Sequence, residues 1–525
     1  AENVISFSSC PMPILAILRK NLQDNKATHI FYTGSLPQIF NGDVLERVYG
    51  YSFKTTAVDD SSDIPAVAGS SVFVSHDQSV SKTALPPNVD FFINTYTEIG
   101  SIIMVQGETN KHYVSAIQHV RRRETIAMTP ANSLKALQSL INRSAIDTHI
   151  HDLENDRTQV VASIHDVTGT NSKAVVGSSG LSVQYAIMMG LVHHAEENHR
   201  GKAIKFVVPP NCYGGTNDQA RRVAAAIKNV EVVDLPVDGD NDMVQSIDMV
   251  LADIARQDAV PYIIAEIPTN PRGEVPDLQK LKEGLEKVRY TKNDETAIDP
   301  VFILDQTFCP NVQFLGEGKI LSTVRALSYV SGSKFPSGGR STAGYCVGNS
   351  KSQNLMEKVE KHLNLCDNEA TPLQYEILAA QLPSMNQRIE AAYQNTRDFV
   401  TYIKNILPEA KINFVSEQLA EKGFKPSVFS LDLPTKGNSA EEREAYKRAL
   451  NHTLINLMIT EIPHESKYCV SYGQLRGCYW TIPATSTQGT TKEGDKDYIA
   501  RVALSPSMDM ERHKEVFANF VDKID

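Results

Sequence analysis

Lys334 stands in a setting that suits the chemistry of a reactive lysine. It follows the β-branched and aromatic run 327–330 and is flanked by Ser331, Ser333 and a glycine pair. A lysine amine is a nucleophile only when it is unprotonated, so a chain that forms an imine through it must lower its pKa by burial or nearby positive charge. The hydroxyls and backbone amides beside it would suit a phosphate group. A structural lysine at a strand end before a glycine turn explains the same local sequence, so both interpretations stay open at this point.

Asp305 is the second candidate for chemistry. It ends the short apolar run 301–304, about thirty residues before Lys334. A buried carboxylate at such a place needs a cationic or hydrogen-bonding partner, and a protonated pyridine nitrogen is one. An aspartate at a strand end is also common as a cap or turn residue. The run 262–265 likewise ends in a carboxylate, Glu266, so two predicted strands end in acids.

The predicted elements that must position these residues indicate an α/β fold. From about residue 160, short β-rich runs alternate with helical ones, which predicts repeated βαβ units and a mostly parallel sheet. Because ligands bind at the carboxyl ends of the strands in such sheets, we expect the site there. The predicted strands are 174–177, 205–209, 230–235, 262–266 and 301–305.

The chain divides into three predicted regions. Residues 1–117 are an N-terminal extension of unknown role, rich in serine, with short strand-like runs such as 71–75. Residues 118–384 form the large domain. Residues 385–525 form a smaller C-terminal α/β domain, whose expected elements are strands at 428–433 and 499–505 and a closing helix over 509–521. A mostly helical stretch, 376–407, is expected to link these two domains.

Composition excludes several classes of function. The chain has 525 residues, 41 % of them apolar, and a formal net charge of −10, and its only dense basic run is Arg121 to Arg123, so no nucleic-acid partner is expected. The seven cysteines are scattered without a CxxC pair, which fits reduced thiols and predicts a cytoplasmic protein. No segment approaches the roughly 18 apolar residues of a membrane span.

Five short motifs follow one another in a characteristic order. They are Ser-Ser-Gly-Leu at 178–181, Tyr-Gly-Gly-Thr at 213–216, Glu-Ile-Pro-Thr-Asn-Pro at 266–271, Asp-Gln-Thr-Phe at 305–308 and Ser-Gly-Ser-Lys at 331–334. Together they resemble the cystathionine synthase and lyase family of pyridoxal phosphate enzymes, over roughly residues 118 to 525. The resemblance implies pyridoxal 5′-phosphate as the cofactor and the α/β fold type I of the aspartate aminotransferase kind, with the first 117 residues left unexplained.

The resemblance also implies roles around the cofactor ring. Lys334 would hold the cofactor as an internal imine and later move protons between substrate carbons. Asp305 would pair with the pyridine nitrogen and keep it protonated, so that the ring accepts electrons from a carbanion. Tyr213 would stack on the ring and act as an acid or base near the leaving group, and Asn270 would approach the ring hydroxyl or the substrate carboxylate.

Two further groups of residues are implied at the ends of the cofactor and substrate. Backbone amides of Gly180 and Leu181 at a helix start would bind the phosphate, which agrees with the anion preference of a helix N-terminus. The side chains expected to join them at the cofactor are Ser331, Ser333 and Thr307. Arg501 would clamp the substrate α-carboxylate with its planar fork, helped by Ser471. Arg501 can also be explained as a strand residue whose side chain snorkels to solvent. Arg388 lies near a matching family arginine, but a solvated position on a helix explains it equally well.

The chain departs from the family at several places. The family's Tyr-x-Arg pair, which reaches across a dimer interface to the neighbour's phosphate, is missing from the matching stretch 123–130. Either the run Arg121 to Arg123 supplies the charge in another way, or it is a solvated basic cluster. The segment after the lysine is Gly-Gly-Arg-Ser at 338–341 in place of Gly-His-Ser-Asp, and Gly215 stands where methionine γ-lyases carry a cysteine. These departures predict a divergent branch with a rebuilt substrate side.

The predicted function is pyridoxal phosphate-dependent β- or γ-elimination, or γ-replacement, on a sulfur-containing or O-acylated amino acid. By resemblance the enzyme would be a homodimer or homotetramer. Two alternatives stay open: a relative that keeps the pocket as a structural or sensing module, and an aminotransferase or decarboxylase on the same fold. No metal is expected, because His149, His151 and Asp152 have ligand types but no third and fourth ligands nearby.

Overall fold

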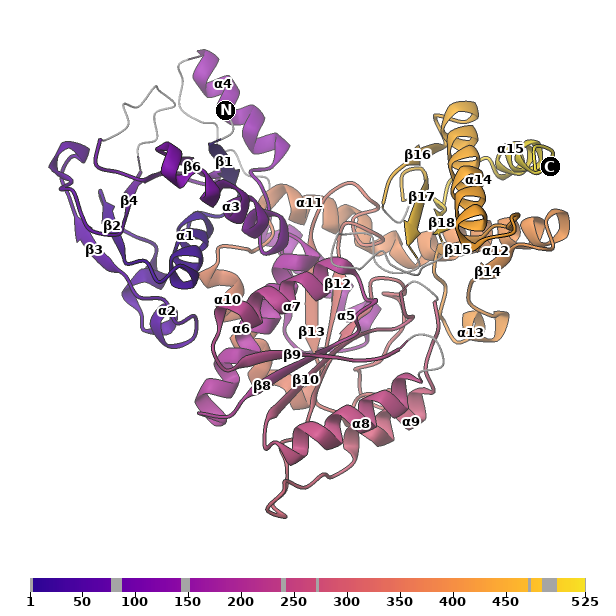
Figure 1. Cartoon of the computed structure of the whole chain (residues 1–525), viewed down its shortest axis with the longest axis horizontal. Coiled ribbons are helices and arrows are strands. Elements are labelled where there is room, and N and C mark those ends of the chain that lie inside the picture. The colour runs from indigo at the N-terminus through magenta and orange to yellow at the C-terminus, as the bar shows by residue number, and fades with distance from the viewer. Residues whose placement is uncertain are drawn as a thin grey trace.

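The computed structural model describes residues 3–76, 87–142, 152–237, 242–270, 273–470, 474–483 and 498–524. These residues form three α/β parts, built on sheets of six, seven and five strands. In Figure 1 the seven-stranded sheet lies at the centre, with the N-terminal part on the left and the C-terminal part at the upper right. Within the described ranges, no helix combines the length and apolar character that a membrane-spanning segment needs.

The first part is a domain with its own mixed sheet. The strands are β1 (Val4–Phe7), β2 (Thr28–Tyr32), β3 (Lys54–Ala57), β4 (Ser70–Ser75), β5 (Phe91–Tyr96) and β6 (Gly100–Val105), in the order β1-β6-β5-β4-β2-β3. Strands β2 to β5 pair in parallel, and β6 pairs antiparallel to both β5 and β1. Its helices are α1 (Met12–Gln23), α2 (Val44–Arg47), α3 (His112–Arg123) and α4 (Pro130–Asn142), with the short 3-10 helices η1 (Gln38–Asn41), η2 (Ser61–Asp63) and η3 (Glu108–Asn110).

The expected boundary after residue 117 falls inside helix α3. Beyond α3, Met128 and Ala136 of the α4 region still pack against Tyr96 and Ile99 of the first sheet. We therefore propose that the N-terminal domain includes α4 and that the large domain begins near α5 (Leu153–Thr168). The strand expected over 71–75 is β4.

The central sheet is mostly parallel, as predicted. Its strands are β7 (Ala174–Gly177), β8 (Ile204–Val208), β9 (Val230–Asp234), β10 (Val260–Glu266), β11 (Val301–Asp305), β12 (Ala326–Ser331) and β13 (Gly344–Gly348), in the order β7-β13-β12-β11-β10-β8-β9. Only β13 runs antiparallel to its two neighbours. Strands β10 and β11 are buried along their whole length, because helices cover both faces of a parallel sheet, and they are apolar apart from the carboxylates at their ends.

The helices of the central domain are α5, α6 (Gly180–Asn198), α7 (Gly214–Ala226), α8 (Met243–Arg256), α9 (Leu278–Glu286), α10 (Gln353–Leu365) and α11 (Pro372–Gln381), with the 3-10 helix η4 (Ser350–Ser352). Helix α6 is buried on almost every side. Its Val183 and Leu191 belong to one continuous apolar core with Ile14 and Leu45 of the N-terminal domain. The N-terminal domain is thus packed onto the central domain through a shared core.

The C-terminal part has a five-stranded sheet in the order β14-β15-β18-β17-β16. Its elements are η5 (Leu382–Ser384), α12 (Met385–Ile406), β14 (Lys411–Asn413), α13 (Glu417–Glu421), β15 (Val428–Asp432), α14 (Ala440–Glu461), β16 (Ser466–Tyr468), β17 (Gly477–Pro483), β18 (Tyr498–Ala503) and α15 (Met510–Val521). The expected linking helix is interrupted at η5, because Pro383 cannot donate the helical hydrogen bond. The boundary at 384 coincides with the start of α12 and is kept as a proposal.

Candidate functional site

One cavity of about 270 Å³ lies where the carboxyl ends of β10, β11 and β12 meet. It is close to the lower end of the range of roughly 300 to 1,000 Å³ that is typical of small-molecule sites. Ten of the residues predicted from the sequence line it: Gly180, Leu181, Tyr213, Asn270, Asp305, Thr307, Ser331, Ser333, Lys334 and Arg501. The eleventh, Ser471, lies outside the described residues, as do His149 and His151.

Lys334 follows β12, and its partly buried side chain lines the cavity. Its Nζ donates a hydrogen bond of 3.3 Å to Ser333 Oγ, which lies 2.9 Å from Ser331 Oγ. Burial lowers the pKa of Lys334, although Cys469, Cys478 and Asp305 act in the opposite direction. A lysine with a lowered pKa keeps a larger share of unprotonated amine, which is the form that attacks a carbonyl.

Glu266 and Asp305 form a pair of buried carboxylates at the ends of β10 and β11. They are directly opposite in the parallel register, and only 6 % and 8 % of their surfaces are exposed. Burial, and then the charge of Asp305, raises the pKa of Glu266 to about 8. Burial also raises the pKa of Asp305, although the hydrogen bonds that it accepts from Thr307 act in the opposite direction. A cation in the cavity would favour the charged form of both.

Hydrogen bonds hold the two carboxylates in place. The backbone N–H of Thr307 donates to Asp305 Oδ1 at 2.9 Å, and that of Tyr213 donates to Glu266 Oε1 at 2.7 Å. The other oxygen of Glu266, Oε2, is buried without a hydrogen bond to any described residue. An orphaned buried acceptor at a cavity wall marks a place where a ligand donor would be stabilised.

The cavity wall at the start of α6 is suited to an anion. Helix α6 begins at Gly180, with Ser179 as its N-cap in a capping box with Ser182. A Cβ on Gly180 would lie 2.9 Å from the Cα of Ser331, so only glycine lets the helix start approach the end of β12 this closely. The backbone N–H groups of a helix start and the hydroxyls of Ser331 and Ser333 therefore face one space, and both favour a phosphate.

Arg501 on β18 lies against aromatic rings at the C-terminal side of the cavity. Its guanidinium is 5.8 Å from the ring centre of Phe308 and 5.9 Å from that of Trp480, its cross-strand partner. Its Nη1 donates a hydrogen bond of 2.5 Å to Asn270 Oδ1. With 5 % of its surface exposed, Arg501 is buried at the cavity and does not snorkel to solvent.

Sequence reasoning missed several residues of the cavity wall: Thr125, Ile126, Gln184, Glu266, Tyr329 and Trp480. Glu266 carried a usable signal, because it ends a predicted buried strand within a recognised motif. Gln184 accepts hydrogen bonds of 3.0 Å from both Tyr329 and Thr216, which links α6, β12 and α7. Gln184, Thr125 and Ile126 stand in no motif, so nothing local in the sequence indicated them.

The basic run Arg121 to Arg123 is not a uniformly solvated cluster. Arg123 is 4 % exposed and forms an ion pair of 2.7 Å with Asp218, whereas Arg122 is exposed and lines the cavity. Arg388 does not line the cavity; its Nη2 donates to the backbone oxygen of Gln381 at 2.8 Å. Asp152, a metal-ligand type in the sequence, is the N-cap of α5.

No protein-family model and no curated protein matches this chain. Solved structures do match it. Cystathionine gamma synthase from Xanthomonas oryzae pv. oryzae, in complex with aminoacrylate and cysteine, is 18 % identical with a TM-score of 0.50 over 70 % of this chain and 85 % of that one. A protein from Micromonospora echinospora described as a cystathionine gamma lyase is 15 % identical, with a TM-score of 0.52 over 70 % and 86 %.

Cystathionine gamma-lyase from Lactobacillus plantarum, complexed with L-serine, is 19 % identical with a TM-score of 0.50 over 70 % of this chain and 85 % of that one. In each comparison the matched part is most of the other protein but leaves out almost a third of this chain. This chain therefore has the fold of the cystathionine gamma synthases and lyases, which confirms the fold class expected from its sequence, and it carries additional structure beyond that fold.

Proposed function

We propose that this protein is a pyridoxal phosphate-dependent enzyme that carries out β- or γ-elimination, or γ-replacement, on a sulfur-containing or O-acylated amino acid. The observation that carries the proposal is the meeting of Lys334, the Asp305 carboxylate and the hydroxyls of Ser331 and Ser333 at one cavity. The motif order supports it, as does the fold shared with cystathionine gamma synthases and lyases.

The residues of the cavity fit pyridoxal phosphate. Lys334 offers an amine of lowered pKa for the aldehyde, and Asp305 offers a carboxylate for the pyridine nitrogen. The start of α6 and the serine hydroxyls offer an anion site for the phosphate. Bound there, the cofactor would supply an electron sink for the carbanion formed at the substrate α-carbon.

The chain's own residues would divide the remaining work. Arg501 would bind the substrate α-carboxylate, since it is a buried cation whose position is held by Asn270 and two aromatic rings. Lys334 would take the α-proton and return a proton to the product. Tyr213, whose position is held through its backbone bond to Glu266, would donate or accept a proton near the leaving group.

Gly215 supports the narrower choice of substrate. A Cβ on Gly215 would lie 2.5 Å from Cε1 of the Tyr213 ring, so a cysteine at this position would displace that ring. Methionine γ-lyase activity, for which the family carries a cysteine here, is accordingly disfavoured. Among the proteins of this fold, the Xanthomonas oryzae enzyme binds cysteine and aminoacrylate in one structure and cystathionine in another, which favours substrates of that size and type.

The test is product analysis on purified full-length protein loaded with pyridoxal phosphate. Cystathionine, cysteine and acylated homoserines would be supplied in turn, with and without a thiol acceptor, and ammonia, ketoacid and thioether products would be measured. We expect turnover of at least one of them and none with the Lys334→Ala variant. Spectral change without product would favour a sensing module, and conversion of the cofactor to its amine form would indicate an aminotransferase.

Two further expectations stay predictions. A homodimer or homotetramer is expected from the family resemblance, and light scattering on the eluting protein would measure it. A cytoplasmic location is expected from the scattered cysteines, none of which forms a disulfide with another cysteine.

A further inference from the structure

The N-terminal domain reaches the wall of the cavity where α3 ends and the chain continues toward α4. Helix α3 ends at Arg123, and three residues around this end, Arg122, Thr125 and Ile126, line the cavity beside the start of α6. The proteins that share the fold are covered to 85 % or more, whereas this chain is covered only to about 70 %. The cavity wall thus includes a segment of the N-terminal domain, which has its own sheet.

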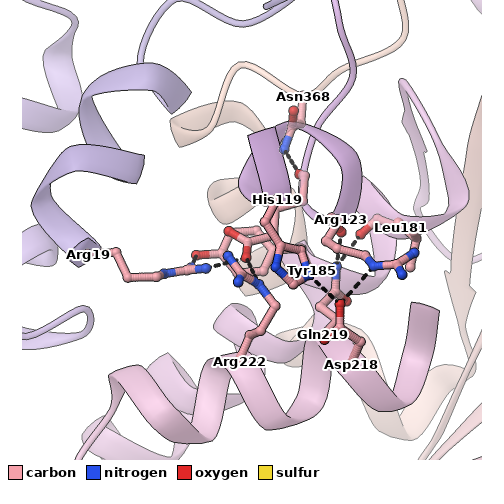
Figure 2. Close-up of polar contacts among 10 residues, drawn as sticks. Arg19, His119, Arg123, Leu181, Tyr185, Asp218, Gln219, Arg222 and Asn368 are labelled. Atoms are coloured by element: carbon pink, nitrogen blue, oxygen red, sulfur yellow. Dashed lines mark hydrogen bonds and ion pairs between the residues drawn. The ribbon is translucent and has the colours of Figure 1, made fainter. Parts of the chain in front are cut away.

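Asp218 anchors the end of α3 to helix α7. Its Oδ2 accepts from Arg123 Nε and from His119 Nε2, both at 2.7 Å, as Figure 2 shows. Burial opposes ionisation of Asp218, but the hydrogen bonds from His119 and Arg123 outweigh it and lower the pKa of this carboxyl. A buried arginine held by a charged acceptor is fixed in position, and so is the turn that follows it.

Gln219 ties the same turn to the start of α6. Its Nε2 donates to the backbone oxygen of Arg123 at 2.6 Å and to that of Leu181 at 2.8 Å (Figure 2). Leu181 is the second residue of α6, at the anion-binding end of the cavity. Because one amide nitrogen bonds both carbonyls, the end of α3 lies next to the start of α6.

Glu124 completes the anchor from the other side. It is fully buried and forms ion pairs with Arg19 of α1 and with Arg222 of α7, while its backbone oxygen accepts from Asn368. Arg19 also donates a hydrogen bond of 2.8 Å to the Tyr185 hydroxyl on α6. In Figure 2, Arg19 and Arg222 approach this point from different helices. The segment 123–124 is therefore held by contacts to α1, to α7 and to Asn368.

Arg122 differs from both neighbours in what it contacts. It is exposed to solvent and to the cavity, and its side chain forms no ion pair or hydrogen bond with any described residue. Its neighbour in sequence is Arg123, whose backbone oxygen and that of Leu181 both accept a hydrogen bond from Gln219. An arginine fork that lines the same cavity as a helix start and two serine hydroxyls is suited to recognise a phosphate.

We infer that Arg122 binds the phosphate of the ligand held in the cavity, and that Arg123, Asp218 and Gln219 position it there. The N-terminal domain thus completes the phosphate site from within the same chain. This inference rests on the proposed function, because pyridoxal phosphate is the ligand that brings the phosphate. It gives the N-terminal domain a definite part in the site.

The experiment compares two ligands that differ only in the phosphate. Cofactor-free full-length wild type, Arg122→Gln and the control Arg121→Gln would each be titrated with pyridoxal phosphate and with pyridoxal. Binding would be followed by the emission of Trp480, the single tryptophan, which lines the cavity. We expect Arg122→Gln to weaken pyridoxal phosphate binding about tenfold or more, since it removes one charged hydrogen-bond donor, and to leave pyridoxal binding unchanged. Arg121→Gln should change neither.

Each outcome decides one of the two proposals. Equal affinity of Arg122→Gln and wild type for pyridoxal phosphate would overturn the inference and leave the proposed function standing. An equal loss of affinity for both ligands would also overturn it, since the loss of a phosphate contact cannot weaken the binding of pyridoxal, which has no phosphate. If wild type bound neither ligand, the proposed function would be wrong and the inference would fall with it.

A second pair of variants tests the positioning contacts. Arg123→Lys keeps a cation for Asp218, whereas Arg123→Gln removes it. We expect Arg123→Gln to weaken pyridoxal phosphate more than pyridoxal, and Arg123→Lys to restore at least half of that selective loss. Circular dichroism would verify that both variants are folded. Failure of lysine to restore selectivity in a folded protein would contradict the positioning role.

Discussion

Glu266 and Asp305 lie directly opposite each other on parallel strands β10 and β11, both buried at the wall of one cavity. Ionising both of these buried, neighbouring carboxylates is unfavourable. The pair therefore keeps one proton up to a pH at which an isolated carboxylic acid would have lost it. A bound cation would remove the conflict. The pair is thus suited to a positively charged ligand and is a source of pH dependence when no ligand is present.

The stability of the cofactor-free protein should fall as pH rises across this pair. The pKa of Glu266 is raised, mainly by burial and then by Asp305, from 4.5 to about 8. The folded state therefore binds this proton more tightly than the unfolded chain, and the stabilisation is complete below pH 4.5 and lost as pH rises through about 8. We expect the melting temperature to fall less steeply over this range in Glu266→Gln than in wild type.

The control for this series is Glu283→Gln, which removes an exposed carboxylate of α9. It should retain the wild-type slope of melting temperature against pH. Parallel slopes for wild type and Glu266→Gln would show that the pair does not couple protonation to folding.

Asp305→Asn should weaken pyridoxal phosphate binding and stabilise the empty protein at neutral pH. An amide cannot hold a proton on the pyridine nitrogen, so we expect about a tenfold or greater rise in Kd. Removing one of two neighbouring carboxylates also relieves the repulsion that Glu266 meets in the empty site. Titration of the cofactor and thermal melting of the empty protein at pH 7.5, about the physiological value, would test both effects. A variant with unchanged affinity would contradict the role of Asp305.

Lys334 should be the residue that carries the cofactor. Treatment of the loaded protein with borohydride, followed by proteolysis and mass spectrometry, should find the added mass on the peptide that contains Lys334. The Lys334→Ala variant should show no such adduct and no turnover. An adduct on another lysine, with turnover kept in Lys334→Ala, would refute the assignment.

Arg501→Lys should raise KM with a smaller effect on kcat. Lysine keeps the charge but loses the planar fork, so a carboxylate would lose one of two charged hydrogen bonds, each worth about 1.5 to 3 kcal/mol. We expect KM to rise roughly 10- to 100-fold. Arg388→Lys is the matched control, since Arg388 does not line the cavity and donates to Gln381 instead. A larger effect from Arg388 than from Arg501 would place the substrate carboxylate elsewhere.

Arg19→Ala should destabilise the whole protein, because it leaves Glu124 buried with Arg222 as its remaining ion-pair partner. Breaking a buried ion pair costs about 3 to 5 kcal/mol, and we expect the lower end of that range here. Arg256→Ala, which removes one partner of an exposed pair, should change stability by less than about 0.5 kcal/mol. Urea unfolding of both variants measures the difference. Equal midpoints would mean that the N-terminal domain is not anchored through Glu124.

The central fold could be predicted from the sequence because its signals are local. Alternation of apolar strands and helical runs predicted β7, β8, β9, β10 and β11, and Pro383 accounts for the break before α12. Strand ends and glycine turns also indicated where polar side chains would gather, since the carboxyl ends of parallel strands meet at one edge. The N-terminal domain was only partly visible: β4 was predicted, whereas β3 is exposed along its whole length and has no apolar alternation to indicate it.

What the sequence by itself determined is which residues are capable of the chemistry: a lysine after a strand, carboxylates at strand ends, and a glycine at a helix start. Tertiary structure decided which of them line one cavity. Arg501 meets Asn270 across 231 residues of sequence, and Arg123 meets Asp218 across 95. The three arginines at 121 to 123 look alike as a run, yet helix packing buries Arg123 and turns Arg122 to the cavity. Local sequence sets backbone preference and side-chain type, whereas burial and partners depend on contacts between distant segments.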